Sequence, residues 1–258
     1  AVVQVHDDYI AAGARIITTN SYSTIPSYLA KADMAESYQA LTEVAAKLAR
    51  QSADSANSPV MVAGCLPPLD ESYRHDLVPE DGPSREIYQE LVRVLLPYAD
   101  LYLCETMSNA REAANAAAAA RAIDPHKPVW VAWTLHESPG KGLRSGESLA
   151  QALAAVEEFA PDAYLFNCTS PAAICAGVET LAALTDKPIG AYPNSFHVPD
   201  GWTLDNDKPV EARDMTVDDF IAFARECQDK GASIIGGCCG IGPSHIDAMV
   251  KDFGLADT

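Results

Sequence analysis

The sequence predicts an α/β protein whose parallel strands close into a (β/α)8 (TIM) barrel, and three observations support this fold class. Short apolar runs alternate with longer segments of helical periodicity along the 258 residues. The runs are apolar almost throughout, as is typical of strands buried on both faces of a parallel sheet. Residues with polar, ionisable or metal-binding side chains lie at the end of nearly every run. A barrel brings the carboxyl ends of its strands together at one mouth, where active sites lie.

Seven of these runs are predicted to be strands. They span residues 14–22, 59–65, 100–106, 128–135, 163–168, 188–193 and 232–239. The residues expected at the mouth are Asn20, Cys65, Glu105, His136, Cys168, Asn194 and Cys238. A doubly wound open sheet is the competing architecture, but no GxGxxG motif follows the first run, which weakens a dinucleotide-binding interpretation. We therefore favour the barrel.

Helical patterns between the runs supply the outer layer. Apolar residues recur at helical spacing in 34–48 and 87–95. Ser170, followed directly by a proline, has the signature of a helix N-cap. Thr216 and Asp219 resemble a capping box in which Asp replaces the usual Glu.

The first residues of the chain bear on the strand count. Residues 2–12 are predicted to be the last turns of a helix that ends at Gly13. Since a helix should follow a strand in this rhythm, we expect the first barrel strand to lie upstream of Ala1. Residues 1–258 would then form a single barrel domain that lacks this strand; a seven-stranded or open sheet is the alternative.

Composition narrows the function. The chain carries a net charge of −18 at pH 7, so the phosphate backbone of a nucleic acid would be repelled. No apolar run approaches the about 20 residues that span a membrane, and no signal-peptide pattern is visible. We expect a cytoplasmic protein with neither nucleic acid nor membrane as partner, and the oligomeric state stays open.

Cysteine usage argues against a disulfide framework. The chain has seven cysteines, and Cys238 and Cys239 are adjacent. In a reducing compartment such cysteines are more often buried, catalytic or metal-binding. Cys175 and Cys227 fall within helical patterns and are expected in the core.

The strongest local signal is the segment 236–240, Gly-Gly-Cys-Cys-Gly, at the end of a predicted strand. Glycines on both sides let the backbone turn so that the sulfurs of Cys238 and Cys239 can face one point. Two thiolates at one point suit a soft metal, most commonly zinc. Cys168 ends the strand two positions earlier in the repeat and is the expected third ligand. Three protein ligands leave one tetrahedral position open, which is typical of catalytic zinc sites; small buried residues are the alternative interpretation.

Motifs along the whole chain resemble those of the homocysteine S-methyltransferase family. This family includes betaine– and S-methylmethionine–homocysteine methyltransferases and the homocysteine domain of cobalamin-dependent methionine synthase. The matching segments are HDDYIAAGARIITTNSY (6–22), ETMSNAREA (105–113), GLRSGESL (142–149), FNCTSP (166–171), YPNS (192–195) and GGCCG (236–240).

The resemblance implies a zinc-bearing, homocysteine-binding barrel in which the three cysteines named above hold the metal and present the substrate thiol. It also implies that Glu105 binds the amino group of homocysteine and that Tyr22 and Asn194 line the same mouth. The implied activity is transfer of a methyl group from a sulfonium or quaternary ammonium donor to the homocysteine thiol, giving methionine.

Two features depart from the family pattern. Its members begin with a strand that carries an Asp-Gly-Gly motif, which this chain lacks, and residues 64–76 differ from the Gly-Pro-Tyr loop near the donor pocket. The donor is therefore not carried over. A zinc- or thiol-binding barrel without turnover and the homocysteine module of a cobalamin-dependent methionine synthase remain alternatives. A zinc hydrolase is disfavoured, because three thiolates weaken the Lewis acidity of zinc and no obvious general base adjoins them.

Other candidates near the mouth are expected to be structural. Cys65 ends a strand and could touch the site, but packing as a small residue is favoured. Cys104 should point away from the side of the strand that carries Glu105. His136 is expected to have a hydrogen-bonded structural role. Trp202, in a long loop, is the best aromatic candidate for a cationic donor.

Overall fold

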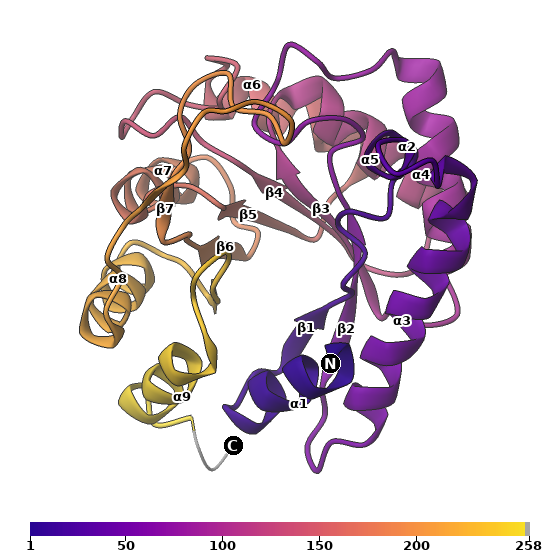
Figure 1. Ribbon diagram of the computed structural model, residues 1–258. Helices are drawn as coiled ribbons and strands as arrows, with labels where there is room; N and C mark the ends of the chain where they lie inside the picture. The colour runs from indigo at the N-terminus through magenta and orange to yellow at the C-terminus, as the bar shows by residue number, and fades with distance from the viewer. Residues whose placement is uncertain (256–258) are drawn as a thin grey trace.

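A curled parallel sheet forms the centre of the protein, and helices line its convex side (Figure 1). The computed structural model describes residues 1–255. The strands follow one another in the order β1-β2-β3-β4-β5-β6-β9, and every neighbouring pair is parallel. Their bounds are β1 Ile16–Thr18, β2 Met61–Leu66, β3 Leu101–Met107, β4 Val129–Trp133, β5 Ala163–Asn167, β6 Ile189–Tyr192 and β9 Ile234–Ile235.

The helices alternate with the strands of the sheet along the chain, as the sequence pattern predicts; α1 precedes β1 and α9 follows β9. They are α1 Val2–Ala11, α2 Pro26–Ala30, α3 Tyr38–Asp54, α4 Asp81–Leu95, α5 Ala110–Ile123, α6 Leu149–Val156, α7 Pro171–Ala182, α8 Val217–Asp229 and α9 Pro243–Asp252, with the short 3-10 helices η1 Ala35–Ser37 and η2 Glu157–Phe159. A small antiparallel pair, β7 Phe196–His197 and β8 Glu211–Ala212, lies in the long connection after β6. No helix within residues 1–255 is both long and apolar enough to cross a membrane.

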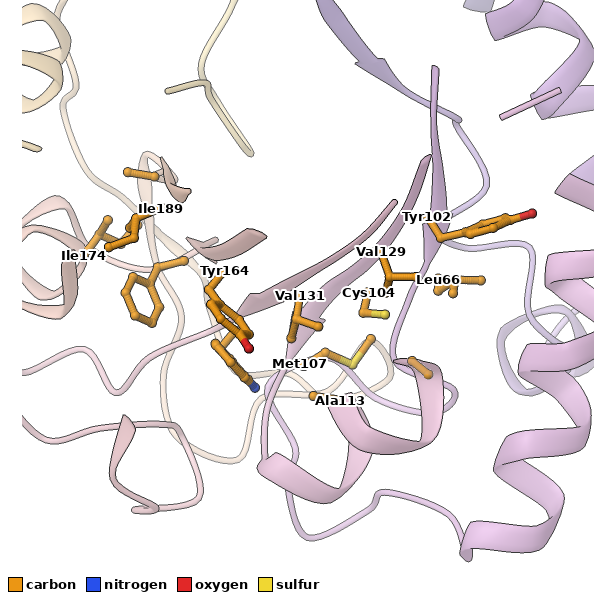
Figure 2. Close-up of a cluster of buried hydrophobic side chains, with 14 of the residues drawn as sticks. Leu66, Tyr102, Cys104, Met107, Ala113, Val129, Val131, Tyr164, Ile174 and Ile189 are labelled. Atoms are coloured by element: carbon orange, nitrogen blue, oxygen red, sulfur yellow. The ribbon is translucent and has the colours of Figure 1, made fainter. Parts of the chain in front are cut away.

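Both faces of the sheet are apolar, as the unbroken apolar runs predict. Alternate residues of β3 point to opposite sides: Leu101 and Leu103 join a small cluster on the concave side, whereas Tyr102 and Cys104 join the larger core. That larger core contains the residues labelled in Figure 2, and Ala113 of α5 packs there against strand side chains. Packing against the helices therefore stabilises the sheet from its convex side. The candidate site lies on the concave side, at the carboxyl ends of the strands.

The predicted helix ends are confirmed. The Ser170 hydroxyl accepts a hydrogen bond from the Ala173 amide at 3.3 Å. Thr216 and Asp219 form the reciprocal capping box at the start of α8. The helix predicted over residues 2–12 is α1, and it is followed by Gly13 at a left-handed φ of 100°.

Strand length departs from prediction at both edges of the sheet. Residues 14–22 and 232–239 were expected to be strands, but only Ile16–Thr18 and Ile234–Ile235 pair. Beyond Ile235 the backbone turns through the glycine-flanked cysteines, so the apolar run ends in a turn instead of extending the ladder.

The two edges of the sheet are brought towards each other by their helices. α1 contacts α9, and the Tyr9 hydroxyl donates to the Ile241 carbonyl at 2.6 Å. In residues 1–255 the sheet has seven strands and ends at β1 and β9. The strand expected upstream of Ala1 stays a prediction.

Candidate active site

The structure brings Cys168, Cys238 and Cys239 together at the carboxyl ends of β5 and β9. Their sulfur atoms all lie within 4.8 Å of one another. The Sγ of Cys168 is 3.8 Å from that of Cys239, which is 3.9 Å from that of Cys238. Cys168 is buried, Cys238 is half-buried and Cys239 is exposed, so the cluster opens towards solvent on one side.

Glycines shape the turn that carries the cysteine pair. At Gly240, φ is 83° and an added Cβ would lie 1.7 Å from the Ser195 Oγ. At Gly237, an added Cβ would lie 2.3 Å from the Ile241 side chain. The Cys238 amide donates to the Pro193 carbonyl at 2.9 Å, which ties the turn to the end of β6.

Hydrogen bonds of a buried asparagine, instead of glycines, fix the backbone next to Cys168. Cys168 and Thr106, at the ends of β5 and β3, both have left-handed φ angles, 52° and 61°. Side chains with a Cβ rarely adopt this conformation, and it persists where the surroundings impose it. The fully buried Asn167 supplies that constraint: its Oδ1 accepts from the Thr106 amide at 3.1 Å and its Nδ2 donates to the Thr106 Oγ1 at 2.7 Å.

The donor set fits a soft divalent metal. Hydrogen bonds with Cys168 and Cys238 lower the pKa of Cys239 well below that of an ordinary thiol, whereas the pKa values of Cys168 and Cys238 are raised, so the negative charge of the cluster is placed on Cys239. The amide of Asn194 faces the cluster, with Nδ2 3.9 Å from the Cys168 Sγ. The Asn194 Oδ1 is buried without a hydrogen-bond partner. An acceptor oxygen in that state suits a cation or a ligand donor nearby.

Glu105 lies on β3, on the concave side of the sheet. Its Oε2 accepts from the Cys65 thiol at 3.3 Å, and burial raises the pKa of the carboxyl. Burial and then the neighbouring Glu105 raise the pKa of Tyr192 well above its usual value. Cys65 is buried as the favoured interpretation expects, and its thiol also contacts the candidate substrate-binding carboxylate, which was the alternative. Cys104 lies in the core on the opposite face, as predicted.

Tyr22 lies beside the cluster, and its hydroxyl is 2.7 Å from the Ser72 Oγ. Burial raises its pKa well above the usual value, and the nearby Cys168 contributes. The His136 Nδ1 accepts a hydrogen bond from the Ser138 amide at 2.9 Å. Cys175 and Cys227 are core residues of α7 and α8, as predicted.

Sequence reasoning missed Tyr73. Its hydroxyl lies 3.0 Å from the Cys168 Sγ, and its ring meets Trp202 edge-on at a centroid distance of 6.1 Å. The Arg144 guanidinium lies over the same ring, 4.9 Å from its centroid. The available signal was a tyrosine in residues 64–76, the loop that departs from the family pattern.

The fold and the site together define a class of protein: a parallel α/β protein with a three-sulfur donor set and a carboxylate at the carboxyl ends of its strands, where active sites of such folds lie. The sequence profile described as homocysteine S-methyltransferase matches residues 1–253. The chain therefore belongs to the homocysteine S-methyltransferase family, whose members are methyltransferases.

Individual relatives agree with this assignment. The chain is 29% identical to homocysteine S-methyltransferase 3 of Arabidopsis thaliana, over 97% of this chain and 79% of the relative. It is 30% identical to homocysteine S-methyltransferase 1 of Zea mays, over 97% and 83%. Among solved structures, the metallated form of the homocysteine methyltransferase MmuM from Escherichia coli superposes with a TM-score of 0.79 at 26% identity, covering 97% of this chain and 83% of MmuM.

Proposed function

We propose that this protein transfers a methyl group from a sulfonium or quaternary ammonium donor to the thiol of homocysteine, giving methionine, at a zinc ion held by Cys168, Cys238 and Cys239. The convergence of three sulfurs from two distant chain segments within 4.8 Å carries the proposal. The relatives named homocysteine S-methyltransferase and the metallated MmuM structure support it.

The cysteines make the site suited to thiol chemistry. A zinc ion with three thiolate ligands would keep one position for the homocysteine thiol and favour its anionic, nucleophilic form. Because Cys239 is exposed and Cys168 is buried, the substrate would approach from the Cys239 side.

Glu105 is the proposed partner of the homocysteine ammonium group. It lies on the concave side of the sheet, where burial strengthens its interaction with a cation. We propose that Tyr22 and Asn194 line the same pocket, because both lie beside Cys168. These side chains would hold the thiol in one orientation, and such positioning accounts for much of the rate in a displacement of this kind.

The methyl donor would meet the thiolate in one displacement. The sulfur forms a bond to the methyl carbon while the bond from that carbon to the positively charged sulfur or nitrogen breaks. The leaving group keeps the electron pair and departs as a neutral thioether or tertiary amine. Tyr73, which contacts Cys168, and Trp202, which meets the Tyr73 ring edge-on, are aromatic candidates for binding the donor, because aromatic faces attract such cations.

We also propose that residues 1–258 form one homocysteine-binding domain and that the curled sheet is part of a (β/α)8 barrel. The packing of α1 against α9 supports this, because it draws the two sheet edges together. The expected partners are small molecules, since the net charge of −18 disfavours nucleic acid.

Metal analysis combined with a donor screen tests the proposal. The purified protein should contain about one zinc per chain and convert homocysteine to methionine with at least one sulfonium or betaine-type donor. Cys239→Ser should lose both metal and activity, and because Cys239 is exposed its replacement should leave the fold intact. Cys175→Ala, a cysteine of the core outside the cluster, is the matched control and should keep both.

The outcomes separate the candidates. Zinc retained by Cys239→Ser would contradict the ligand assignment. Zinc and homocysteine binding without methionine from any of these donors would favour a thiol-binding barrel, or a module that receives its methyl group from cobalamin.

A further inference from the structure

Tyr73 is the side chain that links the cysteine cluster to charged residues outside it. Its hydroxyl is 3.0 Å from the Cys168 Sγ. A phenol hydroxyl carries its proton at neutral pH, so it can donate a hydrogen bond to the Cys168 sulfur, which would be a thiolate when it holds a metal ion. Hydrogen bonds to charged acceptors are roughly twice as strong as neutral ones.

The position of Tyr73 is not determined by its own backbone preference. Its φ is 67°, in the left-handed region that a bulky residue avoids. This conformation is unfavourable for a residue with a Cβ, so contacts of the side chain must hold Tyr73 there. The structure shows two ring contacts, with Trp202 at its edge and with Arg144 over its face.

Arg144 is the stronger of these two contacts. Its side chain is only 5% exposed, and a guanidinium over an aromatic face is held more strongly when it is shielded from water. The Arg144 Nε is buried without a hydrogen-bond partner, which leaves the ring of Tyr73 as a principal contact of that part of the guanidinium.

Glu137 holds Arg144 from the other side. Its Oε1 accepts from the Arg144 Nη2 at 2.9 Å, and its Oε2 accepts from the Arg213 Nη2 at 3.1 Å. With a side chain only 14% exposed, this carboxylate fixes the guanidinium more firmly than a surface ion pair would. A continuous series of contacts therefore runs from Glu137 through Arg144 and Tyr73 to Cys168.

We propose that Arg144 is a positioning residue: anchored by Glu137, its guanidinium stacks on Tyr73 and directs the Tyr73 hydroxyl at the sulfur of Cys168. The hydrogen bond withdraws electron density from that sulfur and tunes the donor strength of the cluster. The inference deepens the proposed function and rests on it, because the tuned sulfur is a proposed metal ligand. Partners of this kind typically change metal affinity by about 10- to 100-fold.

Cobalt substitution tests the proposal without reference to methyl transfer. Protein loaded with Co²⁺ should show a sulfur-to-cobalt charge-transfer band. Tyr73→Phe removes the hydrogen bond, so the sulfur becomes more electron-rich, the band moves to longer wavelength and Co²⁺ affinity changes by about tenfold. Arg144→Met should shift the band in the same direction. Arg144→Lys, which keeps the charge, should shift it less than Arg144→Met does.

The double variant Tyr73→Phe/Arg144→Met gives the decisive comparison. If Arg144 acts through Tyr73, its spectrum and Co²⁺ affinity should equal those of Tyr73→Phe alone, because coupled residues are not additive. Arg213→Met is the matched control: it removes the other arginine of Glu137 but no contact to Tyr73, so the band should stay in place. Arg144→Met is expected to fold, since Glu137 keeps Arg213 as a partner.

The outcomes distinguish the two proposals. A wild-type protein with no charge-transfer band would overturn the metal site and this inference with it. A wild-type band that Arg144→Met leaves unmoved, or additive effects in the double variant, would overturn the role of Arg144 alone.

Discussion

The two halves of the cysteine cluster are built in opposite ways. Cys168 is 3% exposed, follows a five-residue strand inside the sheet, and contacts Tyr73 and Asn194. Cys238 and Cys239 follow β9, a two-residue strand at the sheet edge whose residues are only half-buried. The Cys168 half is rigid because packing and hydrogen bonds determine it; the paired half depends on glycine geometry and on a few backbone hydrogen bonds.

This difference indicates that a bound metal would stabilise mainly the paired half. Packing and hydrogen bonds already hold Cys168 in place. A metal bound to it should therefore order the turn at residues 236–240. The predictions below test this asymmetry.

Metal removal should have the largest effect. Chelation is expected to raise amide hydrogen exchange of residues 234–242 by roughly 100-fold, because a ligand at 100 times its Kd stabilises the segment it orders by about 2.7 kcal/mol. Exchange of β5 should change by less than about twofold. Hydrogen-exchange mass spectrometry measures both segments in one sample, and equal increases in the two would refute the asymmetry.

Substitution of Gly240 should disrupt the paired half directly. Gly240→Ala places a Cβ 1.7 Å from the Ser195 Oγ at a φ of 83°, and overpacking together with the left-handed strain should cost about 3–4 kcal/mol of unfolding free energy. Gly254→Ala, at φ 66° with no atom within 4 Å, carries the strain without the clash and should cost about 1 kcal/mol.

Urea denaturation and zinc content measure the effect. Adding Ser195→Gly to Gly240→Ala removes the obstructing side chain and should recover part of the stability and metal. No recovery would mean that backbone strain, and not the contact with Ser195, determines the turn.

Loss of Asn167 tests the rigid half. Asn167→Ala removes both hydrogen bonds to Thr106 and leaves the buried backbone amide of Thr106 without an acceptor. The unfolding free energy should fall by about 3 kcal/mol. Asn115→Ala is the control: Asn115 is also buried, but on α5, where it bonds Arg85 and Asp81. Both variants should lose stability, and only Asn167→Ala should weaken zinc binding, as measured by competition with a chromophoric chelator.

Glu112 should contribute a pH dependence that is separate from the cluster. Burial raises its pKa to about 7, although the amide and hydroxyl of Ser108 donate to it. The folded protein then binds a proton more tightly than the unfolded chain does. The stability that this proton provides is present below the unfolded pKa of the carboxyl and is lost as pH rises towards 7.

The expected loss between pH 5 and pH 8 is on the order of 2 kcal/mol. Glu112→Gln should remove this part of the slope in urea titrations at pH 5, 6, 7 and 8 while leaving zinc content unchanged. An identical slope in wild type and variant would show that Glu112 ionises normally.

Several features followed from the sequence alone. Continuous apolar runs and caps such as Thr216 with Asp219 depend on local patterns, so the parallel sheet and the helix starts were predicted correctly. The Gly-Gly-Cys-Cys-Gly segment identified the turn because a left-handed φ and close packing both require glycine. Motif resemblance over most of the chain indicated the family before any contact was known.

Only the tertiary structure decided how the site is supported. Arg144 meets Tyr73 and Asn167 meets Thr106 across long stretches of sequence, and no local period or motif specifies these contacts. The short length of β9 could likewise not be predicted from the sequence, because apolar residues before a turn have the pattern of a strand whether or not they pair with a neighbour. Residue types therefore determined which chemistry the protein can carry out, whereas long-range packing determined the geometry in which the three sulfurs converge.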